Sequence, residues 1–127
     1  MKNNVTLTIT CLLSILLLTF HLAGDIVLGY EKGGLSNLVA FPILVVWLYG
    51  ALVLTGRRSG YIILLLGSLL GLLVPCLHMR GNGLGGAVTK YGADLFFVWA
   101  TLAIGVTALF SLILSVRGLW SLRRRTQ

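Results

Sequence analysis

The sequence predicts an all-α membrane protein, an antiparallel bundle of four transmembrane helices with both termini in the cytoplasm. Of its 127 residues, 57% are hydrophobic and only 10% are charged, whereas about a quarter of the residues in an ordinary soluble domain are charged. Four apolar runs, at 5–24, 38–55, 61–77 and 95–116, approach or exceed the roughly 17 to 25 residues that a helix needs to cross a bilayer. Residues 1–127 are therefore expected to form a single four-helix transmembrane domain.

The first run carries a thin polar stripe on one face of the expected helix. His21 and Asp25 are four residues apart, so their side chains can meet on that face. Helical steps back from this pair lead to Ser14, Cys11 and Thr10. Lipid offers such groups no hydrogen-bond partner, so the stripe predicts a side that faces other protein. A run of about 20 residues is long enough to cross a bilayer, and we expect a retained helix rather than a cleaved signal peptide.

The second and third runs are expected to form a hairpin, because the connection 56–60 is too short for anything but a tight turn. Trp47 and Tyr49 fall near the middle of the second run, where we expect them to fill the core. The third run contains Gly67 and Gly71, a small-xxx-small pattern that lets another helix backbone approach closely.

The fourth run begins after Asp94, a residue that either caps the helix or takes part in a polar site. Gly105 lies on a face of small and weakly polar residues and is expected to contribute to helix packing. The chain then ends in a basic segment that is typical of an anchor at the membrane surface.

Basic residues set the predicted orientation. Seven lie at the N-terminus, in the second connection or in the C-terminal tail: Lys2, Arg57, Arg58, Arg117, Arg123, Arg124 and Arg125. The other two connections hold three: Lys32, Arg80 and Lys90. The excess of positive charge in cytoplasmic segments predicts that both termini lie inside. The net charge of +7 is then explained by topology and by lipid headgroup contact at Arg57, Arg58, Arg123, Arg124 and Arg125, and nucleic acid is not an expected partner.

The same topology brings four ionisable residues to one level at the outer boundary of the hydrocarbon: His21, Asp25, His78 and Asp94. Imidazole and carboxylate groups together suit a divalent transition metal, which would be the cofactor, or a proton. The sequence contains no HxxxH or HExxH spacing to specify a metal. The alternative is that His21 and Asp25 form a hydrogen bond that fixes the helix ends.

Three functional hypotheses follow. The first is a non-enzymatic membrane protein whose outer cluster binds a metal ion or a proton. The second is a structural or accessory subunit that docks through the Gly67 and Gly71 face against another copy or a different membrane protein. The third is a small transporter or channel, although the inner halves of the runs supply only Ser, Thr and Cys as polar groups.

An enzyme is not expected, because no nucleophile is paired with a base. Cys11 and Cys76 lie at different depths and should be free thiols. The small multidrug transporters need a glutamate in the first helix and the quinone-linked disulfide-forming enzymes need paired cysteines, and this chain has neither. Its layout resembles that of small four-helix proteins of the bacterial inner membrane, which is the expected location.

Overall fold

The computed structural model describes residues 2–27, 34–78 and 95–125, and the regular structure in these ranges is all helical. In chain order the elements are α1 (Lys2–Val27), the 3₁₀ helix η1 (Gly34–Ala40), α2 (Phe41–Leu52), α3 (Arg58–His78) and α5 (Leu95–Arg125). Within the described ranges, four segments are long and apolar enough to cross a membrane: Asn4–Val27, Leu35–Leu52, Arg58–Leu77 and Leu95–Arg124. The predicted count of four apolar helices is thus confirmed for this part of the chain.

The helix boundaries differ from the predicted ones most clearly in the second and fourth runs. The α-helical part of the second run begins at Phe41 rather than at residue 38, and Pro42 lies in its first turn. A proline ring clashes with the carbonyl group four residues earlier, which here belongs to Leu38, so the preceding segment takes the 3₁₀ form instead. The last helix extends past residue 116 to Arg125, because the basic tail contains no proline to end it.

A tight reversal joins α2 to α3 and forms the predicted hairpin. The backbone N–H of Val53 donates to the carbonyl of Tyr49 at 2.9 Å, and that of Arg57 donates to the carbonyl of Leu54 at 3.0 Å. Gly56 has a φ of 79°, in the left-handed region that glycine adopts without steric cost. The two helices then pack against each other.

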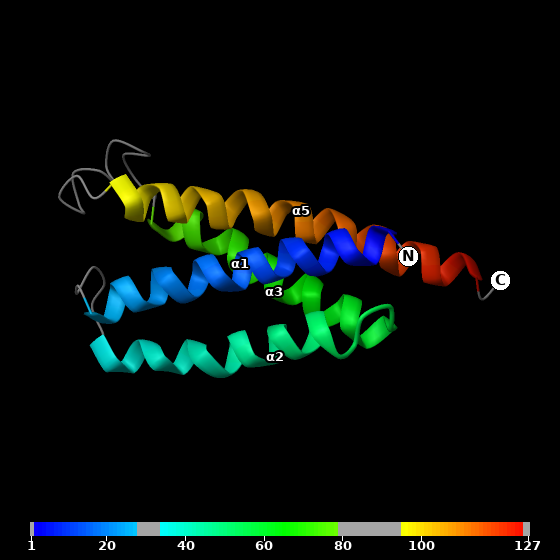
Figure 1. The fold of residues 1–127 in the computed structure, drawn as a ribbon, viewed down its shortest axis with the longest axis horizontal. Helices are drawn as coiled ribbons and strands as arrows, with labels where there is room; N and C mark the ends of the chain where they lie inside the picture. The colour runs from blue at the N-terminus through cyan, green and yellow to red at the C-terminus, as the bar shows by residue number, and fades with distance from the viewer. Residues whose placement is uncertain (1, 28–33, 79–94, 126–127) are drawn as a thin grey trace.

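The two ends of the bundle differ in their residues. In Figure 1, α5 lies along α3 and α1, whereas α2 contacts α1 and α3 on the side away from α5. The N and C labels lie at the same end of the molecule (Figure 1). We call this the arginine end, defined by Arg57, Arg58, Arg117, Arg123 and Arg124. The opposite end, where α1 finishes and α5 begins, is the His21 end, defined by His21, Asp25 and Phe97.

The indole of Trp47 packs on a face of α3 that has no side chain to obstruct it. Trp47 is buried, and a Cβ atom added at Gly67 would lie 2.5 Å from its ring atom Cδ2. Such a separation is well inside van der Waals contact, so only glycine fits there. Tyr49, which we expected in the core beside Trp47, is exposed instead, because two positions along a helix point to different sides.

α3 and α5 approach each other closely at two further glycines. A Cβ atom at Gly71 would lie 2.9 Å from the Cβ of Ala108, and one at Gly105 would lie 3.0 Å from the Cγ of Pro75. Small residues thus allow close backbone approach, as they do in other membrane helix pairs. The Gly67 and Gly71 face of α3 is covered within the chain, by α2 and α5.

Small polar groups lie in the core along α1, α3 and α5. The thiol of Cys11 donates to Ser111 Oγ, with 3.4 Å between the heavy atoms. Three hydroxyls in the core donate to backbone carbonyls four residues earlier on their own helices: Ser14 to Thr10 at 3.0 Å, Ser68 to Leu64 at 2.7 Å and Thr101 to Phe97 at 2.8 Å. The stripe on α1 therefore faces protein, as predicted, and its hydroxyl donors are satisfied locally.

Candidate functional site

The candidate site consists of His21 and Asp25 in the last turns of α1. His21 is only 5% exposed and Asp25 is 8% exposed. Because they are four residues apart on one helix, their side chains meet, and His21 Nε2 lies 3.6 Å from Asp25 Oδ2. The periodicity of the polar stripe therefore predicted both the burial and the pairing of these two residues.

α5 closes one side of the site with an aromatic ring. Phe97 is buried, and its ring stacks on the imidazole of His21 with 4.7 Å between the centroids and 29° between the planes. Offset stacking of this kind restricts the orientation of both rings and excludes water from the covered face. Phe97 thus holds the imidazole in place beside the carboxylate.

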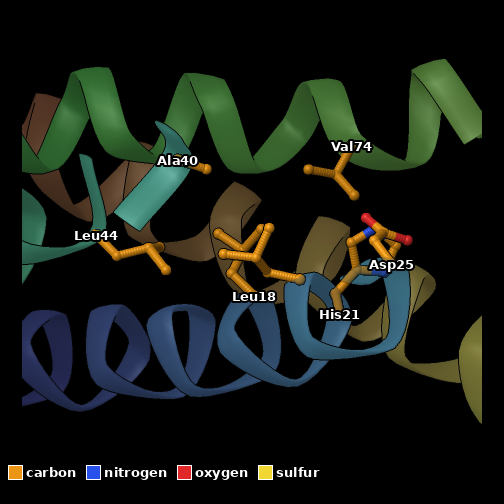
Figure 2. Close-up of a pocket in the computed structure, with 7 residues that line it drawn as sticks. Leu18, His21, Asp25, Ala40, Leu44 and Val74 are labelled. Atoms are coloured by element: carbon orange, nitrogen blue, oxygen red, sulfur yellow. The ribbon is translucent and has the colours of Figure 1, made fainter. Parts of the chain in front are cut away.

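A pocket of about 180 Å³ opens on the other side of the pair. Its lining comes from α1, η1, α2 and α3: Leu18, His21, Leu22, Asp25, Ala40, Leu44 and Val74. Figure 2 shows His21 and Asp25 side by side at one end of this pocket, with Val74 of α3 across from them. A space of this size holds several water molecules or a small solute. His21 and Asp25 are the titratable side chains in an otherwise apolar lining.

The other two predicted members of the cluster are not placed. His78 is the last residue of α3, but its side chain is outside the described part of the structure, and Asp94 lies outside the described residues altogether. Among the described residues, no group of three or more His, Cys, Asp or Glu side chains could hold a metal ion. A metal at His21 and Asp25 would need at least one further ligand. Both cysteines are free thiols, with Cys11 buried and Cys76 exposed.

The arginine end carries the residues predicted to contact lipid headgroups. Arg57, Arg58, Arg123 and Arg124 are exposed, and the side chain of Arg125 is outside the described part. The guanidinium carbon of Arg124 lies 4.3 Å from the centroid of the Trp120 ring, a cation–π arrangement. Four of the five predicted headgroup residues therefore have side chains that solvent or lipid can reach.

Two features of these ends were not predicted from the sequence. One is the stacking of Phe97 on His21, and the other is a hydrogen bond from the Tyr61 hydroxyl to Asn4 Oδ1. Each depends on how two helices are rotated against each other, which hydropathy does not specify when a helix is apolar on every side. The available signal is that Asn4 and Tyr61 are polar residues near the same predicted end of two neighbouring helices.

The described part of the chain has four apolar helices with a buried titratable pair between them. This fold is compatible with a small integral membrane protein. A comparison of the chain with protein-family models, curated proteins and solved structures finds no match.

Proposed function

We propose that this chain is a small non-enzymatic protein of the bacterial inner membrane in which His21 and Asp25 bind a proton at the outer surface. The observation that carries the proposal is the buried pair, with 3.6 Å between His21 Nε2 and Asp25 Oδ2, at the edge of an apolar pocket. Ionisable groups at such positions in membrane helices are costly to bury and are characteristic of functional sites.

The proposed orientation rests on the asymmetry of charge between the two ends. The arginine end holds Arg57, Arg58, Arg117, Arg123 and Arg124. The described ranges contain one acidic residue, Asp25, and it belongs to the His21 end. The positive-inside rule then places the arginine end in the cytoplasm, so that the helices cross as an antiparallel bundle with both termini inside. His21 and Asp25 consequently face the outer compartment.

A proton suits the pair because an imidazole has an ordinary pKa of about 6.5 and changes its charge near neutral pH. Among the described residues, Asp25 on α1 lies beside His21, Phe97 on α5 stacks on its ring, and Val74 of α3 lies across the pocket from the pair (Figure 2). Asp25 lies at 3.6 Å from the imidazole, so the charge of its carboxylate acts directly on a proton at His21. Uptake of one proton changes the charge of the pair in surroundings of low polarity, where its electrostatic effect is large.

Nuclear magnetic resonance of the full chain in lipid discs, with ¹⁵N-labelled histidine, tests the proposal. His78→Asn leaves the signal of His21 alone, which is then followed from pH 4.5 to 8.5. We expect one reversible titration in this range, and Asp25→Asn should shift its midpoint by about one pH unit, the effect of a charge within about 4 to 6 Å. Glu31→Gln removes the same charge from a connection and is the matched control.

An imidazole that keeps one protonation state throughout, or a midpoint that is the same in Asp25→Asn and in the parent chain, would contradict proton binding by the pair. The parent chain, which keeps His78, then receives stoichiometric Zn²⁺. Tight binding that His21→Gln abolishes would replace the proton with a metal ion as the ligand, with His78 and Asp94 as the candidate further ligands.

We do not propose that a partner docks through the Gly67 and Gly71 face. Trp47 and Ala108 of the same chain occupy it, and a partner helix would have to displace both. A transport function also lacks support, because the core hydroxyls described above already donate to their own helix backbones.

A further inference from the structure

We propose that a groove at the arginine end binds one molecule of an anionic phospholipid from the inner leaflet. The inference rests on the membrane orientation in the proposed function but is independent of proton binding at His21. The groove has a volume of about 1060 Å³, comparable to the largest ordinary pockets for small molecules. That is enough for a phosphoglycerol headgroup and the first part of two acyl chains.

Two facing helical stripes form the walls of the groove. Arg58 and Ile62 belong to the first turns of α3 and are four residues apart. The stripe on α5 has spacings of three, four and seven residues and consists of Val116, Leu119, Trp120 and Arg123. Residues at these spacings share one side of a helix, so each stripe presents a continuous surface to the groove.

The order of residues along both walls matches the order of groups in a phospholipid. Arg58 on α3 and Arg123 on α5 lie toward the end of the molecule, whereas Ile62 and Val116 lie further toward the middle of the bundle. Arginine guanidinium groups bind phosphate through paired hydrogen bonds. A lipid phosphate between the two arginines would therefore direct its acyl chains along the apolar residues.

Trp120 lies between the charged and the apolar parts of the α5 stripe and is exposed. Tryptophan prefers this level of a membrane, where its ring contacts both the headgroups and the hydrocarbon. The guanidinium of Arg124, which stacks on the indole at 4.3 Å from its centroid, orients this side chain. Trp120 is therefore suited to contact the glycerol region of the lipid.

The walls of the groove are fixed in relation to each other by Tyr61. Its ring packs directly on Gly118 of α5, and its hydroxyl donates a hydrogen bond to Asn4 of α1. The next residues in the chain are Ile62 on one wall and Leu119 on the other. Because this contact joins three helices beside the groove, the site is formed before the lipid arrives, which lowers the entropic cost of binding.

Charge selects an anionic lipid over a zwitterionic one. The chain has a net charge of +7, and among the described residues the acidic side chain, Asp25, belongs to the opposite end. Each basic residue near the membrane surface attracts anionic lipid. The described lining of the groove contains two arginines and no acidic residue that would repel a lipid phosphate.

Native mass spectrometry of the full chain, released from detergent with defined lipids, measures the dissociation constant of the first bound lipid. Dioleoylphosphatidylglycerol is compared with dioleoylphosphatidylcholine. The test variant is Arg58→Gln with Arg123→Gln, and the matched control is Arg57→Gln with Arg117→Gln, which removes the same charge at exposed positions outside the groove. We expect the affinity for phosphatidylglycerol to fall about tenfold or more in the groove variant and less than about threefold in the control.

An equal loss in both double variants, or equal affinity of the parent chain for the two lipids, would overturn the proposal, because attraction would then come from diffuse surface charge. Should the groove variant fail to fold, Val116→Trp fills the apolar part of the site at an exposed position and keeps every arginine. It should also lower the affinity for phosphatidylglycerol, and unchanged affinity would count against the site.

Two further measurements identify the source of the phosphate and separate this proposal from the previous one. Glycerophosphoglycerol, the headgroup without acyl chains, should not displace the lipid at millimolar concentration, and displacement would show that the groove binds the headgroup alone. The titration of His21 should be the same in the groove variant as in the parent chain. A parent chain that titrates at His21 but does not prefer phosphatidylglycerol would overturn the lipid site alone. A parent chain that prefers phosphatidylglycerol but shows no titration of His21 would overturn the proton site alone.

Discussion

The two ends of this four-helix bundle treat charge in opposite ways. At the His21 end, an imidazole and a carboxylate are 5% and 8% exposed beside a pocket of about 180 Å³. At the arginine end, the five defining arginines are exposed, and two of them, Arg58 and Arg123, line a groove of about 1060 Å³. The same helices thus bury groups that can become neutral and expose groups that stay charged.

This difference follows from protonation chemistry. A histidine or an aspartate in surroundings of low polarity can exchange a proton and avoid carrying a lone charge. An arginine stays protonated at any ordinary pH, so its burial would require a permanent partner. The two ends of the bundle should therefore differ in their response to pH. The His21 end should respond to pH, and the arginine end should respond to lipid charge instead.

Among the variants considered, removal of the Phe97 ring should lower the stability of the chain most. The structural change should be limited to the His21 end. Phe97 is 4% exposed and stacks on His21, whereas the adjacent Phe96 is 61% exposed. Phe97→Ala leaves a cavity and should lower the free energy of unfolding by about 3 kcal/mol. Phe96→Ala should change it by less than about 1 kcal/mol. Thermal unfolding in detergent, followed by circular dichroism, compares the two variants.

The Phe97→Ala chain should also expose the imidazole to water and change the pH at which His21 titrates, with no change in the affinity of the groove for phosphatidylglycerol. Equal effects of the two phenylalanine variants on unfolding would mean that the aromatic stack does not support the site. A change in lipid affinity would mean that the two ends are coupled.

Gly118→Ala should have the next largest effect, at the arginine end. A Cβ atom at this position would overlap the ring of Tyr61, and overpacking of this kind costs about 2 kcal/mol. The same unfolding measurement applies, together with the lipid affinity, which should fall because Tyr61 fixes the groove. Tyr61→Leu removes the ring that the new Cβ atom would meet. The double variant Gly118→Ala/Tyr61→Leu should therefore lose less unfolding free energy than the sum of the losses in the two single variants. Strict additivity would exclude direct overlap as the cause.

The sequence predicted the helices well because length and hydropathy are local properties. It also predicted that His21 and Asp25 pair and face protein, since a polar stripe on an apolar helix has a clear periodicity. It did not predict the short 3₁₀ segment before α2, where Pro42 prevents the α-helix from starting earlier.

The contacts between helices were harder to predict for a physical reason. Lipid is as apolar as a leucine side chain, so buried and lipid-facing positions carry the same residue types. Leu64 is buried and Leu66 is exposed on the same helix, and nothing in their identity distinguishes them. The stacking of Phe97 on His21 and the two walls of the groove depend on helix rotation, which such a sequence leaves open. The positions of His78 and Asp94 in the outer cluster stay predictions.

The smallest expected effect comes from the hydrogen bond that joins α3 to α1 at the arginine end. Tyr61→Phe keeps the ring on Gly118 and removes the hydroxyl that donates to Asn4. We expect a loss of about 1 kcal/mol, the usual net value of one hydrogen bond in a partly buried place. Tyr49→Phe, at an exposed tyrosine of α2, is the control and should be neutral.

Asn4→Ala, alone and combined with Tyr61→Phe, completes a double-mutant cycle. The cycle isolates the free energy that the hydrogen bond between the two side chains contributes. If the two changes together cost no more than either one, the bond accounts for the effect, and the affinity for phosphatidylglycerol should fall only slightly because the ring still fixes both walls. Fully additive losses would assign the effect to each side chain separately. The rigidity of the groove would then come from the packing of Tyr61 on Gly118, and the arginine end would be held by shape rather than by polar contacts.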